Sequence, residues 1–181
     1  MRIAGELVEQ EIPSREGTVY ITARHVYKTF GGRTNPYEVW SIYKIAEAKG
    51  VPVPDTVKFT AKLQDGTNTR TVHGLHSTRV SGRFFQLSNP GGEKILISEI
   101  KKITNCKLLE TVIKGLRNAS KHGVMDLRGF IDVNKNSPLT FIDLHSRGTP
   151  NTAAFEGVLE AAEAQLNKPA DTSRKSRTPG R

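Results

Sequence analysis

Residues 56–63 alternate strictly between apolar and polar side chains, and no other segment limits the possible folds of the chain as much. The apolar positions are Val57, Phe59, Ala61 and Leu63. Because successive side chains of a strand point to opposite faces, the pattern predicts a sheet with one face against a core and one in water. Antiparallel sheets have this property, and Asp65-Gly66 predicts a hairpin turn just after the strand.

The rest of the chain predicts further strands and few helices. Strands are expected at 67–75, about 78–88, 124–133 and 139–145. Residues 18–30 predict one long strand that has Val19, Ile21, Ala23 and Tyr27 on the same face. Residues 94–98 fit either a short strand or the start of a helix.

Three helices are expected, at about 36–49, 105–122 and 152–167. Asn35 and Pro36 are typical of an N-cap and a first helical position, and Gly50 of a helix end. The first helix has the apolar stripe Val39, Ile42, Tyr43 and Ala46. The second has Leu108, Leu109, Val112, Ile113 and Leu116. Because strands outnumber helices without regular alternation, we expect an α+β fold, a mainly antiparallel sheet packed by two or three helices in a single domain.

The composition divides the chain into three parts. Residues 1–150 would form the α+β core domain, and 151–167 an acidic amphipathic helix. Residues 168–181 hold no large apolar residue and carry five Lys/Arg against one Asp, so we expect a disordered basic tail. The N-terminal residues lack the apolar centre of a secretory signal, and a single cysteine, Cys106, favours a reducing, intracellular location.

Catalytic and metal-binding motifs are weak in this sequence. We find no phosphate-binding Gly-Lys-Ser/Thr loop, no Gly-x-Ser-x-Gly elbow and no His-Glu-x-x-His motif. His73 and His76 could share a metal ion, but partly exposed histidines explain them more simply. Cys106 fits a half-buried helix cysteine better than a nucleophile. The carboxylates Asp126, Asp132 and Asp143 fit strand ends better than an acid–base pair. We therefore expect a protein that is not an enzyme and uses no cofactor or metal.

The charge balance points to anionic partners. The chain has 27 Lys plus Arg against 18 Asp plus Glu, a formal charge of +9, which favours association with nucleic acid or anionic membrane. Residues 101–122 concentrate six basic residues against Glu110 alone. They are Lys101, Lys102, Lys107, Lys114, Arg117 and Lys121. On the predicted helix most of them share a stripe opposite the apolar one, so we predict a polyanion-binding face; the alternative is an ordinary solvated face.

Two further basic groups could extend this face. Arg70, Arg79 and Arg83, together with His73 and His76, would form a second cluster in the hairpin region. The tail adds Lys168, Arg174, Lys175, Arg177 and Arg181, each able to meet a phosphate in a salt-dependent contact. A tail that serves only solubility is the alternative.

The last predicted helix has the opposite charge. Its acidic residues are Glu156, Glu160 and Glu163, and its thin apolar stripe is Phe155, Leu159, Ala162 and Leu166. The helix could pack on its own domain, or it could pack on the basic surface of the next copy. The second arrangement would be a head-to-tail contact that builds lattices or filaments. We predict Phe155, Leu159, Glu156 and Glu160 as self-association residues.

The order of elements over roughly 18–147 resembles the core of rhabdovirus matrix proteins. The similar segments are TVYITARHVYKTF, NPYEVWSIYKIAEAKG, VKFTAKL, CKLLETVIKGLRNASKH and GVMDLRGFIDV. The chain lacks the long N-terminal arm with a Pro-Pro-x-Tyr motif found in animal-virus members, and its basic segment lies at the other end, which suits a plant-infecting member. The resemblance implies a virion protein, made in the host cytoplasm, that condenses a nucleocapsid, self-associates and lies against a lipid envelope.

Together these patterns predict a viral structural protein of matrix type. Its partners would be a nucleocapsid or nucleic acid, other copies of itself and anionic lipid. The alternative is a monomeric basic RNA- or DNA-binding accessory domain. An enzyme of unrecognised type would require a deep cleft that holds Asp, His and Arg with strongly perturbed pKa values.

Overall fold

The computed structural model describes residues 1–14, 16–32, 34–124, 127–144 and 152–168, and it has the expected α+β fold. The large sheet contains β1 (Arg2–Ile3), β2 (Glu6–Leu7), β3 (Gln10–Ser14), β4 (Gly17–Ile21), β5 (His25–Phe30), β6 (Thr56–Asp65) and β7 (Asn68–Thr78). The small sheet contains β8 (Arg83–Gln86), β9 (Arg128–Ile131) and β10 (Leu139–Ile142). The helices are α1 (Pro36–Ala48), α2 (Gly92–Ile100), α3 (Cys106–Lys121) and α4 (Thr152–Leu166).

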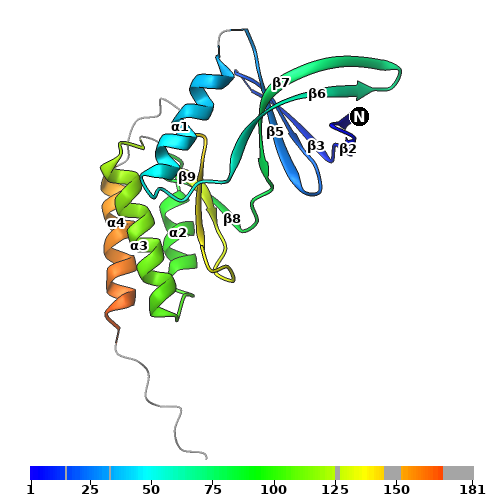
Figure 1. Cartoon of the computed structure of the whole chain (residues 1–181). Coiled ribbons are helices and arrows are strands. Elements are labelled where there is room, and N and C mark those ends of the chain that lie inside the picture. The colour runs from blue at the N-terminus through cyan, green and yellow to red at the C-terminus, as the bar shows by residue number, and fades with distance from the viewer. Residues whose placement is uncertain (15, 33, 125–126, 145–151, 169–181) are drawn as a thin grey trace, which may run out of the picture.

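The large sheet is antiparallel throughout, in the order β2-β1-β6-β7-β5-β4-β3. Its longest pair is β6–β7, which extends from Thr56 opposite Ser77 to Asp65 opposite Asn68. The turn between them uses Gly66 at a φ of +59°, so the hairpin predicted from Asp65-Gly66 is confirmed. Figure 1 shows this hairpin projecting away from the helices.

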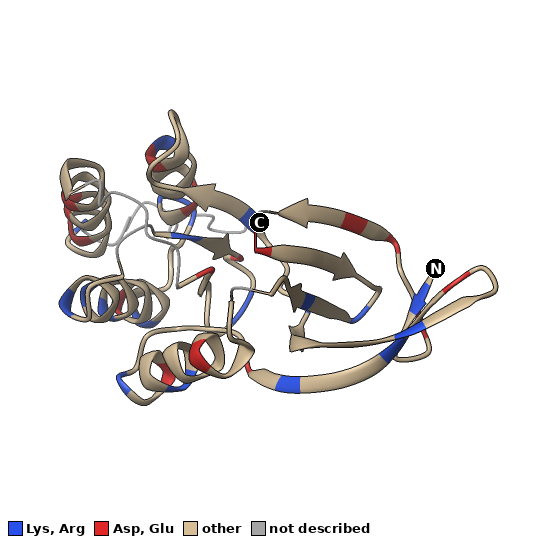
Figure 2. Ribbon diagram, turned by 90° about the horizontal axis from the view of Figure 1, so that it is seen from above, with Lys and Arg blue, Asp and Glu red and all other residues tan. Residues whose placement is uncertain are grey.

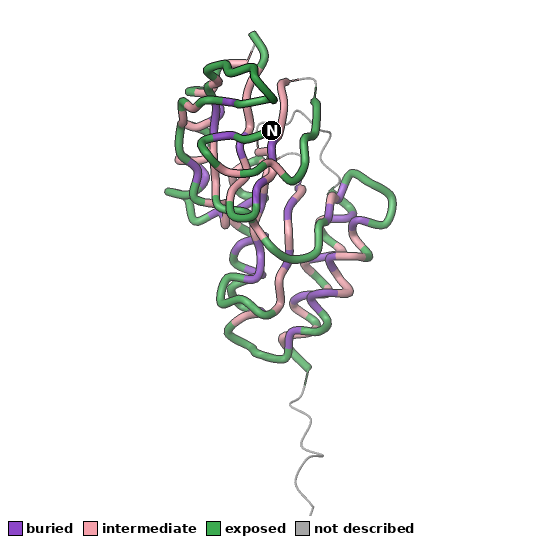
Figure 3. Tube along the Cα trace, turned by 90° about the vertical axis from the view of Figure 1, so that its right-hand side faces the viewer, coloured by how far each residue is buried: buried purple, intermediate pink, exposed green. Residues whose placement is uncertain are grey.

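The small sheet and three helices form the larger of two cores. The sheet has the order β10-β9-β8, and α2, α3 and α4 lie side by side next to it (Figure 1). The largest fully buried side chains of this core include Phe85, Phe141, Leu96, Ile100 and Leu116. A smaller core on the large sheet consists of Ile3, Tyr20, Tyr27 and Leu63. Figure 3 shows buried segments in both regions. None of the helices in the described ranges is long and apolar enough to cross a membrane.

The single strand predicted for 18–30 is wrong, because the chain reverses in the middle of this segment. The Thr22 N–H donates to the His25 carbonyl at 2.9 Å, which closes a tight turn between β4 and β5. Tyr20 therefore pairs with Tyr27, and both face the smaller core. The predicted shared face fails for the same reason: the turn breaks the period of two, and Ala23 lies exposed in the turn.

Helix α1 begins and ends as predicted. The Asn35 side chain accepts a hydrogen bond from the Tyr37 N–H at 2.9 Å, Pro36 occupies the first turn, and Gly50 follows at a φ of +74°. The predicted apolar stripe needs one correction. Val39 and Ala46 are buried, whereas Ile42 is exposed.

Other differences concern segments with weak periodicity. The short strands β1, β2 and β3 precede the first expected strand. Residues 94–98, for which a short strand or the start of a helix was expected, belong to helix α2. The strands expected at 78–88, 124–133 and 139–145 are shorter than predicted. In α4 the buried positions are Ala154, Val158 and Ala162, and the other members of the predicted stripe, Phe155, Leu159 and Leu166, pack half-buried against the larger core.

Candidate polyanion interface

Helix α3 presents one buried and one charged face. Asn105 caps its start by accepting hydrogen bonds from Lys107 N–H at 2.9 Å and Leu108 N–H at 3.3 Å, and Gly123 follows its end at a φ of +67°. The buried side is Leu109, Val112, Ile113, Gly115, Leu116 and Ala119. At Gly115 an added Cβ would lie 3.0 Å from Pro52 Cγ, so glycine lets the helix pack closely on this loop.

The opposite face of α3 carries the predicted basic stripe. Lys107, Lys114, Arg117 and Lys121 are all exposed. Figure 2 shows the blue bands of this helix beside the red bands of α4. Only Arg117 is paired, to Glu163 of α4 at 2.7 Å. Within the described part of the chain, Lys107, Lys114 and Lys121 form no ion pair, so their charge is available to an external anion.

The two lysines between α2 and α3 differ in their surroundings. Lys101 is exposed and forms no ion pair with any described residue. Lys102 lies 2.7 Å from Glu99 Oε1, and Arg83 of β8 lies 3.0 Å from the same oxygen. The hydrogen bond from Lys102 lowers the pKa of the buried Glu99 below its ordinary value; burial opposes this shift, and Arg83 adds to it. Lys102 and Arg83 are therefore partly neutralised within the fold.

The structure does not bring the second predicted basic cluster together. Arg70 lies near the β6–β7 turn, where its guanidinium is 3.5 Å from the Tyr20 hydroxyl. Arg79 follows β7 and pairs with Glu9 at 2.5 Å, whereas Arg83 belongs to the small sheet. His73 and His76 are three residues apart on one strand and so point to opposite faces of it. In the described residues no group of three or more His, Cys, Asp or Glu side chains could hold a metal ion.

The acidic helix α4 packs on its own chain. Phe155 and Leu159 are half-buried against the larger core, while Glu156 and Glu160 are exposed. A contact with another copy through α4 would therefore depend mainly on the two glutamates. Lys168 is exposed, and its ammonium donates to Gln165 Oε1 at 2.8 Å. The other predicted tail residues, Arg174, Lys175, Arg177 and Arg181, lie outside the described residues.

A cleft between the two sheets was not predicted. It has a volume of about 1160 Å³, and most of its walls are apolar. These walls include Ile12, Val19, Ile21, Val26, Phe84 and Phe130. They come from both sheets, so periodicity within one segment could not reveal the cavity. In the sequence, only the apolar side chains of 19–26 indicated that a second face of the sheet is shielded from water.

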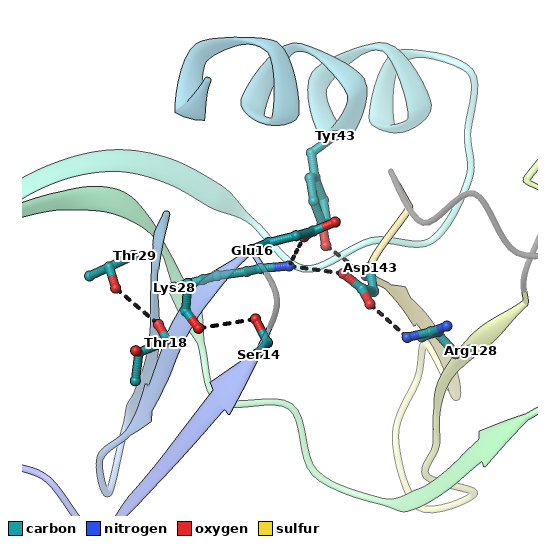
Figure 4. Close-up of polar contacts among 9 residues, drawn as sticks. Ser14, Glu16, Thr18, Lys28, Thr29, Tyr43, Arg128 and Asp143 are labelled. Carbon is teal, nitrogen blue, oxygen red and sulfur yellow. Dashed lines mark hydrogen bonds and ion pairs between the residues drawn. The ribbon is translucent and has the colours of Figure 1, made fainter. Parts of the chain in front are cut away.

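Several residues that line the cleft belong to an ion-pair network, which Figure 4 shows. Lys28 of β5 lies 3.1 Å from Glu16 Oε2 and 3.0 Å from Asp143 Oδ1. Arg128 of β9 lies 2.7 Å from Asp143 Oδ2, and the Asp143 N–H donates to the Tyr43 hydroxyl oxygen at 2.8 Å. Burial raises the pKa of Tyr43 to about 12. Both carboxylate oxygens of Asp143 thus hold cations that tie the sheets together.

A second polar group lies at the cleft wall formed by β5 and β7. His25 Nδ1 is 2.6 Å from Glu6 Oε1, and Tyr27 and Thr22 also donate to this carboxylate. Burial raises the pKa of Glu6, but the three hydrogen bonds together lower it below its ordinary value. The pKa of His76 is lowered by burial and by nearby His25. Because Glu6 and His25 satisfy each other, this group fits a structural role better than acid–base chemistry.

Comparisons with protein-family models, with characterised proteins and with solved structures find no match to this chain. The features of the chain that bear on its function are therefore the basic face of α3 and the cleft between the two sheets.

Proposed function

We propose that this chain is a structural protein of matrix type that binds a polyanion through the exposed face of α3. The observation that carries the proposal is a group of exposed lysines, on α3 and just before it, that form no ion pair with described residues. They are Lys101, Lys107, Lys114 and Lys121. A solvated protein surface normally mixes charges of both signs, whereas this face is offset only by Glu110 on α3 and by Glu163 of α4 among the described residues. Each lysine that meets a phosphate releases counterions, which drives binding at low salt.

The matrix-type part of the proposal adds self-association and a nucleocapsid as partner. The resemblance of 18–147 to rhabdovirus matrix cores supports it, as does the separation of charge between a basic α3 and an acidic α4. Head-to-tail contacts between surfaces of opposite charge do not close, so they can build a lattice around a ribonucleoprotein. Anionic lipid would compete for the same lysines, because both ligands present phosphates. The proposed location is the virion and the host cytoplasm.

Binding of the full chain to single-stranded RNA, and to vesicles with and without anionic lipid, tests the polyanion face. We expect Lys114→Glu to weaken binding to RNA and to anionic vesicles roughly tenfold at low salt. Lys94→Glu is the matched control, because Lys94 is also exposed but lies on α2. Equal effects of the two variants would contradict the α3 site.

Light scattering against protein concentration separates the proposal from a monomeric RNA- or DNA-binding domain. A matrix-type protein should form large species as concentration rises, and RNA should promote them. A protein that stays monomeric without RNA and binds RNA in a one-to-one complex would favour the accessory domain.

A further inference from the structure

Helix α1 has an outward face that no described part of the chain covers. In Figure 1 the helix lies at the periphery, above the layer formed by α2, α3 and α4. Val39 and Ala46 on its inner side are buried. On the outer side Ile45 is 54% exposed and Ile42 is 37% exposed. Two large apolar side chains on one side of the helix are therefore left uncovered by the described chain.

The two isoleucines belong to a regular seam. Glu38, Ile42, Ile45 and Lys49 follow one another at spacings of four, three and four residues, and all four are exposed. These spacings place them on one side of a helix, as in the contact line between paired helices. The seam is apolar in the middle, acidic at its start and basic at its end. Its two charged residues lie at equal distances from its centre and have opposite charges.

Neither end of the seam is neutralised by the described chain. Glu38 accepts only a 3.4 Å hydrogen bond from Asn35 and forms no ion pair with a described residue. Lys49 lies near His122 and Lys121. Burial lowers the pKa of His122, and the positive charges of Lys49 and Lys121 lower it further. A carboxylate brought to Lys49 would therefore meet a region that is locally positive.

We propose that α1 packs antiparallel against α1 of a second copy across a two-fold axis. Turning the seam end for end places Ile42 against Ile45 of the second copy. The same register places Glu38 against Lys49 of the second copy, so apolar burial and ion pairing require one alignment. A two-fold contact uses the same patch on both copies and closes as a dimer. Glu38 and Lys49 select the antiparallel direction, because a parallel pair would place like charges together.

This dimer deepens the self-association in the proposed function but does not use the lysines of α3. A lattice requires more than one kind of contact, because a two-fold contact by itself stops at a pair. The α1 pair would supply the closed contact, and the α3–α4 charge contact would extend the assembly. Dimer formation and RNA binding can therefore fail separately.

Sedimentation equilibrium of the full chain, at a salt concentration that suppresses larger assemblies, tests the dimer. Glu38→Lys and Lys49→Glu should each weaken dimerisation roughly tenfold, because each turns two attractive pairs into repulsive ones. The double variant that carries both changes should restore dimerisation to within about threefold of the native value. Ile45→Asp should abolish the dimer. Glu11→Lys, an equivalent change at the exposed β3, is the control and should leave it intact.

Three outcomes would overturn the proposal. They are a native chain that stays monomeric, a dimer indifferent to both single reversals, and a double variant as weak as the single ones. RNA binding measured on the same proteins keeps the two proposals distinct. If the reversal variants keep the oligomeric state of the native chain and bind RNA normally, only the α1 contact is refuted. If the native chain dimerises but binds no RNA, only the polyanion site is refuted.

Discussion

Lys28 and Asp143, 115 residues apart in sequence, join the large sheet to the end of the small sheet through an ion pair of 3.0 Å. Asp143 also holds Arg128 and has a φ of +58°, a backbone conformation that few non-glycine residues adopt. The position is thus defined both by charge and by backbone geometry. Through Asp143 the pair connects Lys28 of β5 to Arg128 of β9, one strand from each sheet (Figure 4).

Asp143→Asn should lower the free energy of unfolding by about 2 kcal/mol, between the values typical of exposed and buried ion pairs. Asparagine tolerates the left-handed backbone, so the change removes mainly the charge. It leaves the half-buried cations of Lys28 and Arg128 with less compensation. Urea unfolding gives the free energy directly. Asp55→Asn, at a carboxylate that is 75% exposed, should change it little, and an equal loss at both positions would contradict the role of Asp143.

Lys101 and Lys102 are adjacent and both exposed, but among the described residues only Lys102 has an ion-pair partner. Lys101→Ala should weaken RNA binding more than Lys102→Ala, because Glu99 already compensates Lys102 at 2.7 Å. Lys102→Ala should instead lower the free energy of unfolding slightly, since Glu99 would keep only Arg83. Filter binding and urea unfolding of both variants test this division. Identical losses of RNA affinity would show that the Glu99 pair does not matter.

The stability of the fold should decrease as the pH falls below 6.5 because of His76. Burial, and then nearby His25, lower the pKa of His76, whereas Glu6 and Asp55 raise it less. Below pH 6.5, the ordinary value, the unfolded chain binds this proton more readily than the native chain does, so the free energy of unfolding falls until the pH passes the native pKa. In His76→Leu this contribution should disappear. Unfolding curves with the same pH slope in both proteins would contradict the assignment.

The sequence predicted the elements that carry their own periodicity. The β6–β7 hairpin and α1 lie where alternation, Asn35 and the glycines placed them, and α3 lies where its apolar spacing placed it. The exposed lysines of α3 followed from the same helical spacing. These features depend on residues close together in the chain, so local patterns are enough to find them.

Features that depend on distant residues were missed. In the sequence the turn at Thr22–His25 could not be told from a continuous strand, because its central residues are Ala23 and Arg24 and not glycine or proline. The cleft and the Lys28–Asp143 pair combine segments far apart in sequence. The neutralisation of Lys102 and Arg83 by Glu99 depends on how α2 packs beside β8. Sequence position does not show which basic residues near α3 have an ion-pair partner, so all of them were expected to be equally available to an anion.

The most direct test of the polyanion face compares two triple variants of equal net charge. One replaces Lys107, Lys114 and Lys121 with alanine, and the other replaces the exposed residues Lys62, Lys94 and Lys135. Binding to single-stranded RNA is measured against salt. We predict that the α3 variant loses at least about tenfold in affinity and about 2 in the slope of log K against log salt, while the control keeps both nearly unchanged. Equal losses in the two proteins would show that net charge, and not the face of α3, drives binding.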